Sequence, residues 1–431
     1  MTAPLRIGLA GLGTVGGGVV RLLAEHADLI AERAGRPIRV TAVSARDRAR
    51  NRDLPLDGAR WADDALSLAG ASDVDVVVEV IGGAEGIAKA LTEASIAAAK
   101  PVVTANKAML ALHGTALARL AEGKGVPIAC EAAVAGGIPI VKALREGLAA
   151  NRMTRVFGIL NGTCNYILTQ MQTSGRGFGD VLAEAQALGY AEADPSFDVD
   201  GIDAAHKLAV LAGIAFNRPM DFGSVHIEGI RAVEAVDIEY ARDLGYRIKL
   251  LAIARRTATG IEQRVHPCMV AADSAIAHVD GVFNAVVAEG DFVDRTMYVG
   301  RGAGAGPTAS AVVADLIDVA RGRVPPLFGV GSTRLADIAA SPMQRHVGPY
   351  YVRLNVLDRP GVIADVAAIL RDENISIESM LQRARALSGE AVPVVLVTHQ
   401  TEEAAMQRAL AKIAALAASV APPCMIRIEQ L

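Results

Sequence analysis

The feature that most constrains this 431-residue chain is a glycine-rich turn close to its N-terminus. Residues 5–10 (LRIGLA) are typical of a short buried strand, the run 11–18 (GLGTVGGG) breaks it, and a helical pattern follows to about Ala31. The spacing G-x-G-x-x-G permits a tight turn, close approach of the backbone to a pyrophosphate, and a helix packed closely on the strand. Because a helix N-terminus presents free N–H groups to anions, the pattern predicts a dinucleotide site. Its predicted cofactor-binding residues are Gly11, Gly13, Thr14, Val15 and Gly16.

Strand and helix patterns alternate over the next hundred residues. Strand patterns lie at 38–43, 73–81, 101–105 and 126–134, and helical patterns lie at 85–99 and 108–122. This alternation predicts βαβ units, and therefore a doubly wound parallel sheet, a Rossmann domain, over 1–135. A further helical pattern at 307–322 has proline in its first turn. We expect that helix to pack back on the first domain and complete it.

The rest of the chain predicts two further domains within an overall α/β fold. Residues 136–320 mix helical and strand patterns and predict an α+β substrate and dimerisation domain. Its helical patterns lie at 138–149, 179–189 and 201–215, and its strand patterns at 153–160, 247–255, 264–271 and 283–299. Residues 323–348 are rich in proline and glycine and have the composition of a linker. Residues 349–431 follow the order βαββαβ, which predicts a ferredoxin-like domain.

Charge and composition exclude several classes of function. The net charge is −4, and the basic residues form no runs, so we expect no nucleic-acid partner. Uninterrupted apolar segments stay shorter than the roughly 18 residues that a membrane span needs, and the N-terminus does not resemble a signal peptide. The four cysteines are scattered without paired spacing, which argues against a disulfide framework or a zinc site and favours a reducing cytoplasm.

The end of the second strand indicates which dinucleotide is preferred. An NAD-preferring site would place a carboxylate there, and this chain instead has Ser44 and Arg46, with Arg48 beyond. A hydroxyl and a guanidinium suit a 2′-phosphate, so the sequence favours NADP, with NAD still possible.

Two stretches carry candidate catalytic groups. Lys107 follows the fourth strand in 101–107 (PVVTANK), at the strand end that lines the ligand crevice of such sheets. Asp203 and Lys207 are four residues apart in 189–207 (GYAEADPSFDVDGIDAAHK), so they share one face of a helix. A carboxylate there can orient an ammonium group that gives or takes a proton. Taken alone, the pair is better explained as an ordinary helix ion pair.

Together with 161–166 (NGTCNY) and 131–139 (EAAVAGGIP), these stretches resemble homoserine dehydrogenase, in the family's order, from the glycine turn to about residue 320. The resemblance implies interconversion of L-aspartate 4-semialdehyde and L-homoserine, in threonine, methionine and isoleucine biosynthesis. It implies that Lys207 is the proton donor and that Asp203 orients it. It also implies that Lys107 contacts the cofactor and the reacting oxygen, and that Glu192, helped by Asp198, binds the substrate ammonium.

The resemblance implies two further sites. Residues 131–138 are similar to the family's sodium site, with ligands at Glu131, Val134, Gly136 and Ile138. One carboxylate with backbone carbonyl groups is a reasonable donor set for a hard monovalent cation. The stretch 300–306 (GRGAGAG) resembles a second cofactor contact near Gly302.

Residues 350–383 resemble an ACT domain, with Asp358, Pro360 and Gly361 at a strand-to-helix turn and Asn374 opening the next strand. Such domains bind small amino acids at dimer interfaces, which in this family implies inhibition by threonine and a homodimer or homotetramer. A purely structural dimerisation domain is the alternative.

Two other functions are compatible with parts of the chain. Aspartate-semialdehyde dehydrogenase acts on the same metabolite but needs a cysteine nucleophile, for which Cys164 is the candidate. A non-catalytic protein that senses nucleotides and amino acids is the second alternative, and the intact Asp203 and Lys207 argue against it.

Overall fold

The computed structural model describes residues 2–50, 52–383 and 390–431, and its N-terminal part is built on a parallel sheet of order β3-β2-β1-β4-β5-β6. The elements are β1 (Leu5–Ala10), α1 (Thr14–Glu25), α2 (Ala27–Ala34), β2 (Ile38–Ser44), β3 (Arg60–Trp61), α3 (Ser67–Gly70), β4 (Val76–Glu79), α4 (Ile87–Ala97), β5 (Val102–Thr104), α5 (Lys107–Lys124) and β6 (Ile128–Ala129). The predicted Rossmann domain is confirmed, although β6 is much shorter than the strand expected over 126–134. The chain instead enters a 3₁₀ turn at Glu131–Ala133, and Ala135 and Gly136 then adopt left-handed conformations.

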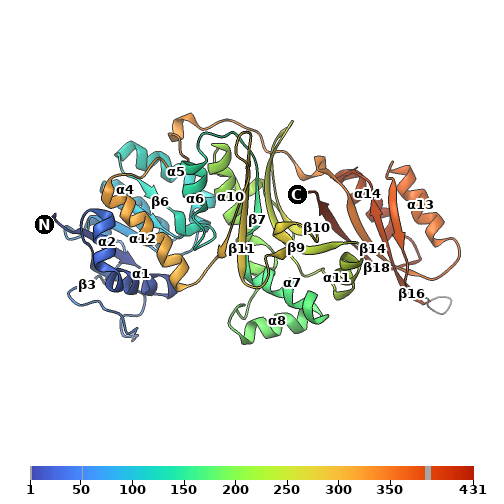
Figure 1. Ribbon diagram of the computed structural model, residues 1–431, viewed down its shortest axis with the longest axis horizontal. Coiled ribbons are helices and arrows are strands. Elements are labelled where there is room, and N and C mark those ends of the chain that lie inside the picture. Colours follow the sequence, from blue (N-terminus) through green and yellow to red (C-terminus); the bar gives the residue numbers. More distant parts are fainter. Residues whose placement is uncertain (1, 51, 384–389) are drawn as a thin grey trace.

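Helix α12 (Ala305–Arg321) returns to this domain from far along the chain, as its sequence pattern predicted. It lies beside α1 in Figure 1, and its buried Ala309, Val312 and Leu316 pack in the same core as Val19 and Val20 of α1. The chain therefore crosses between the first two domains more than once.

A second, ten-stranded sheet occupies the middle and the C-terminal side of the molecule (Figure 1). Its main path runs β12-β11-β7-β9-β10-β18-β14-β16-β15. The middle domain supplies β7 (Met153–Ile159), α7 (Gly162–Ser174), α8 (Phe178–Ala187), α9 (Ser196–Val199), α10 (Ile202–Phe216), β8 (His226–Ile227), α11 (Ala235–Asp243), β9 (Tyr246–Thr257), β10 (Gly260–Ala271), β11 (Phe283–Gly290) and β12 (Asp294–Arg301). The strand pattern at 283–299 is thus a hairpin, and helices α7 and α11 were not predicted.

The C-terminal domain has the predicted βαββαβ order. It consists of β14 (Tyr350–Leu357), α13 (Val362–Asp372), β15 (Ile377–Leu381), β16 (Ala391–Thr398), α14 (Glu403–Ala414) and β18 (Ser419–Glu429), with a small ladder of β13 (Val347–Gly348) and β17 (Thr401–Glu402) beside it. Its strands lie in the order fourth, first, third, second, which confirms the ferredoxin-like prediction.

This C-terminal domain is not a separate unit on a flexible linker. Strand β18 pairs in parallel with β10, Cys268 to Val270 opposite Arg427 to Glu429, so one sheet runs through both domains. The segment 323–348, whose composition is that of a linker, is itself packed. Phe328 is buried, and Ser332 bonds the Glu122 carboxylate through its backbone N–H and its hydroxyl.

Buried charges hold the β10–β18 junction together. Arg264 on β10 is fully buried and bonds Glu262 and Glu429. Arg427 on β18 donates to Glu403 and, at 2.8 Å from each outer guanidinium nitrogen, to Glu228. Removing one partner from such a group leaves a buried charge uncompensated, which typically costs about 3–5 kcal/mol.

Among the described residues, no helix is long and apolar enough to cross a membrane.

The junction predicts a specific loss of stability in acid. Burial raises the pKa of Glu228, but hydrogen bonds from His226 and Arg427 outweigh burial and hold that pKa at about 2. An unfolded glutamate has a pKa of about 4.3. Glu228 therefore contributes stability that is fully present above about pH 4.3 and is lost as the pH falls toward about 2.

We expect Glu228→Gln to melt at a lower temperature than the wild type near neutral pH and to lose less on acidification from about pH 5 to about pH 3. Thermal melts across this range measure both effects. Glu239→Gln, at an exposed position on α11, is the control and should follow the wild type. Parallel curves for all three proteins would contradict the assignment.

Candidate active site

A cleft of about 550 Å³ lies between the Rossmann domain and the ten-stranded sheet. Its wall brings together groups from both domains, among them Val15, Lys107, Asp198, Asp203, Lys207 and Gly302. These include the three predicted catalytic residues, one of the predicted substrate-binding acids, and cofactor-binding positions from both glycine-rich stretches. The prediction that these residues share one site rested on family resemblance, and the fold brings them together.

Lys107 is fixed by the loop that follows β5. Asn106 caps helix α5 by accepting the N–H of Met109, and its own N–H donates to the Thr104 hydroxyl. That hydroxyl in turn donates to Glu79, a fully buried carboxylate at the end of β4. The first residue of α5 is therefore held at the carboxyl edge of the sheet, where ligands of doubly wound folds bind.

Asp203 joins both candidate lysines. Its Oδ2 lies 2.7 Å from Nζ of Lys207, one turn away on α10, and its Oδ1 lies 3.3 Å from Nζ of Lys107. The Lys207 ammonium also donates to the carbonyl oxygen of Leu160 at 2.7 Å. Burial raises the pKa of Asp203, but the positive charges of Lys207 and Lys107 outweigh it and leave that pKa at about 2. The carboxylate therefore stays ionised throughout the physiological range.

Asp198 and Asp203 share one hydrogen-bond donor, the carboxamide nitrogen of Asn161. The Asn161 carboxamide nitrogen donates to Asp198 and to Asp203, each at 2.8 Å, and the Thr163 hydroxyl donates to Asp198 at 3.1 Å. Burial raises the pKa of Asp198, and the neighbouring Asp203 charge raises it further. A cation from a ligand would relieve both effects. The role of Asn161 could not be predicted from the stretch NGTCNY alone, because it depends on contacts with residues 37 and 42 positions away.

Glu192 lies on the loop between Tyr190 and Asp198, both of which line the cleft. Its own side chain is exposed and does not belong to the lining, and its carbonyl oxygen accepts from Gln186. The structure therefore brings Asp198, but not the Glu192 carboxylate, to the catalytic lysines.

The N-terminal glycine turn fits a dinucleotide. Gly11 has φ +103°, and a Cβ at Gly16 would lie 1.9 Å from the Gly11 carbonyl oxygen, so this packing needs glycine at both positions. A Cβ at Gly13 would meet nothing within 4 Å. The open space beside Gly13 is where a pyrophosphate can approach the N-terminus of α1.

A second cleft beside Gly13 and Thr14 is rich in arginine. Arg21, Arg50 and Arg52 line it, and Arg52 donates to the Leu12 carbonyl oxygen at 3.0 Å. Arg46, the sequence candidate, is exposed and does not belong to this lining. These three arginines come from α1 and from the loop after β2 without a common motif, so their convergence could not be predicted from the sequence.

The two glycine-rich crossings between the domains lie against each other. The Gly137 N–H donates to the Arg301 carbonyl oxygen at 3.0 Å, and a Cβ at Gly136 would lie 2.6 Å from the Gly302 carbonyl oxygen. The predicted cofactor contact and part of the predicted sodium segment are thus neighbours.

The candidate sodium segment begins at a buried carboxylate. Glu131 accepts the backbone N–H groups of Val141 and Lys142 at 2.9 and 2.8 Å. Burial, and then the nearby Asp315, raise its pKa to about 7. Val134 and Ile138, which follow Glu131 in the sequence, are also buried. Between them, the chain takes left-handed conformations at Ala135 and Gly136. A buried carboxylate with a raised pKa, next to a tight turn of carbonyl groups, is chemically suited to a hard cation.

Cys164 is unsuited to covalent catalysis. The side chain is fully buried, and its sulfur contacts the carbonyl oxygen of Asp198 at 3.2 Å. Burial, and then the Asp198 charge, raise the pKa of this thiol well above its usual range. Because the thiolate is the nucleophilic form, this environment argues against thioester chemistry.

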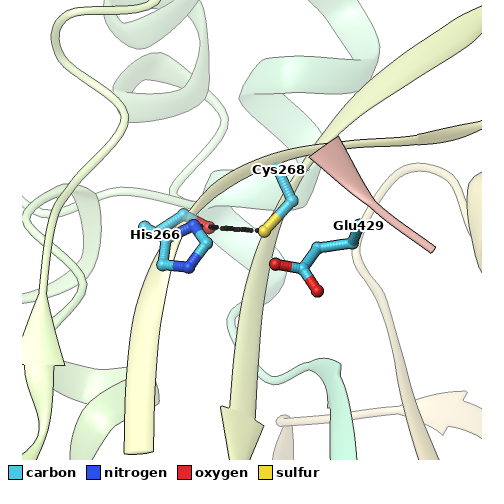
Figure 2. A group of neighbouring side chains, drawn as sticks. All are labelled: His266, Cys268 and Glu429. Carbon is cyan, nitrogen blue, oxygen red and sulfur yellow. Dashed lines mark hydrogen bonds between the residues drawn. The ribbon is translucent and has the colours of Figure 1, made fainter. Parts of the chain in front are cut away.

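One further group of potential metal ligands lies away from the cleft. Figure 2 shows His266 and Cys268 on β10 converging with Glu429 on β18, and their ligand atoms lie within 4.8 Å of one another. Arg264 already bonds Glu429 and approaches His266 Nε2 to 2.8 Å. A metal ion here would meet this buried positive charge, so we interpret the group as part of the ionic β10–β18 junction.

A dinucleotide turn that shares a cleft with two lysines joined by one carboxylate defines a nicotinamide-dependent oxidoreductase. Family models match along the chain: the NAD-binding domain of homoserine dehydrogenase over residues 11–131, homoserine dehydrogenase over 139–317, and the ACT domain over 350–415. The chain belongs to the homoserine dehydrogenase family, with an ACT domain at its C-terminal side.

Relatives and solved structures match over the full length. A homoserine dehydrogenase of Pseudomonas aeruginosa is 48% identical over 435 residues, which covers 99% of each chain. The crystal structure of a homoserine dehydrogenase from Thiobacillus denitrificans, also 48% identical, superposes with a TM-score of 0.92 over 99% of each chain. A hyperthermophilic archaeal homoserine dehydrogenase in complex with NADPH is 26% identical, with a TM-score of 0.64 over 75% of this chain and 100% of that one.

Proposed function

We propose that this protein interconverts L-aspartate 4-semialdehyde and L-homoserine with NADP as the preferred cofactor. The observation that carries the proposal is Asp203, whose carboxylate holds the Lys107 and Lys207 ammonium groups in one cleft with the dinucleotide turn. When bound, the nicotinamide supplies or accepts the hydride. In the family this reaction belongs to the synthesis of threonine, methionine and isoleucine.

The chain's own residues handle charge and protons. In the reducing direction, negative charge grows on the carbonyl oxygen of the substrate, and two fixed ammonium groups stabilise it. Lys207 delivers the proton, because its ammonium is aligned by Asp203 and by the Leu160 carbonyl oxygen. Lys107 lies beside it, across the Asp203 carboxylate, and contacts the reacting oxygen and the cofactor.

Asp198 is the best-supported group for the substrate's ammonium. It lines the cleft, its pKa is raised by burial and by Asp203, and a substrate cation would offset both. Glu192 is the second candidate. It can assist Asp198 only after the exposed loop between Tyr190 and Asp198 brings the Glu192 carboxylate toward the cleft.

The preference for NADP is supported by the arginine-lined cleft beside Gly13. A 2′-phosphate carries up to two negative charges, and guanidinium groups bind phosphate through paired hydrogen bonds. The archaeal family member in complex with NADPH is consistent with this choice.

A sodium ion bound by Glu131 with the carbonyl groups of Val134, Gly136 and Ile138 would neutralise the buried carboxylate whose pKa is raised.

Replacing Na⁺ by choline at constant ionic strength should then lower the melting temperature of the wild type but not of Glu131→Gln.

We further propose threonine as the effector of the ACT domain. The candidate turn is formed by Asp358, Pro360 and Gly361 between β14 and α13, and Gly361 has φ +97°. A ligand that reshapes this domain acts on a sheet that continues into the middle domain through β18 and β10.

A chain of direct contacts leads from β18 to the cleft. Arg427 bonds Glu228, and two residues later the Ile230 N–H donates to the Val199 carbonyl oxygen at 2.9 Å. Val199 follows Asp198, the proposed substrate-binding acid. A shift of β18 would therefore change the position of Asp198 and its contact with the substrate ammonium.

We also propose that the protein is a homo-oligomer and that it is located in the cytoplasm. Among the described residues, β12 is the outermost strand of the sheet on its side. It exposes Val299, while Phe283 is exposed at the start of its partner β11. Such an edge is suited to pairing with a second copy, which supports a homodimer or homotetramer. A cytoplasmic location remains a prediction from the scattered cysteines.

Lys207→Met tests the catalytic assignment. It preserves the length of the side chain but removes the proton donor, so we expect kcat to fall by about 10²–10⁴-fold, the usual contribution of a general acid, with little change in the Kd for NADPH. Absorbance of the reduced nicotinamide with homoserine as substrate measures the rate. Lys249→Met removes another buried ammonium, bonded to Val279 and Asp280, and should lower stability without this loss of kcat. An unchanged kcat in Lys207→Met would refute the role.

Arg50→Gln tests the cofactor preference. Loss of one guanidinium at a phosphate removes about 1.5–3 kcal/mol, so the Kd for NADPH should rise at least about tenfold while the Kd for NADH stays the same. Arg46→Gln, outside the cleft lining, is the comparison. If Arg46→Gln weakens NADPH and Arg50→Gln does not, the sequence candidate is the true contact.

Glu228→Gln also tests the route of regulation. We expect calorimetry to show that threonine binds wild type and variant equally, whereas the steady-state assay shows inhibition of the wild type and weaker inhibition of the variant. Glu239→Gln should behave as the wild type. Absence of threonine binding to the wild type would exclude threonine as the effector.

A further inference from the structure

The hairpin of β11 and β12 places a polar side chain in the cleft wall that the proposed mechanism does not use. Asn284 is the second residue of β11 and is only 1% exposed, yet it lines the cleft together with Asn161 and Gly302. Its backbone pairs with Gly300 on β12, so the side chain is carried by rigid sheet.

The Asn284 carboxamide has no hydrogen-bond partner among the residues that the structure describes, neither at Nδ2 nor at Oδ1. Two other buried asparagines of this domain differ. Asn161 and Asn165 each donate through Nδ2 to two oxygens and accept through Oδ1. Leaving a buried polar group unpaired is energetically costly, so such groups almost always have a partner. Because Asn284 lines the cleft, a bound ligand can supply that partner.

The Asn284 carboxamide packs closely against the backbone of two glycines. A Cβ at Gly302 would lie 2.1 Å from Nδ2 of Asn284, and a Cβ at Gly162 would lie 3.6 Å from its Oδ1. Glycine at both positions keeps the two sides of the carboxamide free of side chains. Gly302 belongs to the crossing segment predicted to contact the cofactor, and Val15 of the dinucleotide turn lines the same cleft.

The pair of free atoms selects the chemistry of the ligand. The substrate's ammonium is already assigned to Asp198, and its carboxylate could use only the donor, so the substrate would leave the acceptor of Asn284 unpaired. A carboxamide offers a donor and an acceptor together and satisfies both. We propose that Asn284 binds the carboxamide of the nicotinamide ring through a reciprocal amide pair and thereby fixes the rotation of the ring in the cleft.

This inference rests on the proposed use of a nicotinamide cofactor, and its test is a binding measurement that does not depend on turnover. Asn284→Leu keeps the size of the side chain and removes both polar atoms. We expect the Kd for NADPH to rise by about tenfold, the value of roughly one net hydrogen bond, while the Kd for 2′-phospho-ADP-ribose, which lacks the nicotinamide, stays within about twofold.

A cofactor analogue sharpens the comparison. The 3-acetylpyridine form of NADP replaces the amide NH₂ by a methyl group, so the wild type should bind it more weakly than NADP, and Asn284→Leu should bind the two equally. Asn165→Leu is the matched control, because it removes a buried carboxamide that is already satisfied by Val279 and Phe283. It should lower the melting temperature without changing the ratio of the two affinities.

Equal weakening of NADPH and of 2′-phospho-ADP-ribose in Asn284→Leu would overturn the inference, as would unchanged binding of NADPH. If the selective loss appears but the wild type fails to oxidise homoserine, the assignment of Asn284 stands and the proposed reaction fails.

Discussion

The contact on which the active site depends is the carboxylate of Asp203 between two ammonium groups. A buried carboxylate is costly by itself, and the ammonium groups of Lys107 and Lys207 would repel each other. Together the three groups form a stable unit in which the pKa of Asp203 is about 2. The unit also joins α10 of the middle domain to α5 of the Rossmann domain. The same ion pair therefore aligns the proton donor, stabilises developing negative charge, and fixes the two walls of the cleft relative to each other.

A second buried ionic cluster has the same role between the middle and ACT domains. Arg264 and Arg427 lie on adjacent, parallel strands, and each is neutralised by two carboxylates. Because β18 belongs to the sheet that also contains β10, the ACT domain cannot shift without deforming that sheet. The short path from Arg427 through Glu228 to Val199 ends beside Asp198. Regulation and substrate binding therefore share one piece of backbone.

Local patterns predicted much of this structure. The turn at Gly11 to Gly16 and the pair Asp203 and Lys207 were readable because all their partners lie within a few residues. Local patterns could not predict the roles of Asn161 and Asn284, or the arginine-lined cleft beside Gly13. Each of these depends on residues brought together from distant segments. The pairing of β10 with β18 was missed for the same reason, as no signal within either strand names its neighbour. Strand 126–134 was predicted too long because the chain leaves the extended conformation for a 3₁₀ turn at Glu131–Ala133, which the apolar pattern does not signal.

The paired crossings between the first two domains have a mechanical consequence. The chain leaves the Rossmann domain at Gly136 and Gly137 and re-enters it through Gly302 and Gly304, and a backbone hydrogen bond from Gly137 to Arg301 ties the two passages side by side. Gly136, Gly302 and Gly304 also line the cleft, so this part of its wall is formed by backbone in direct contact. A side chain added at Gly136 would push the two passages apart and separate the domains where the cleft lies between them.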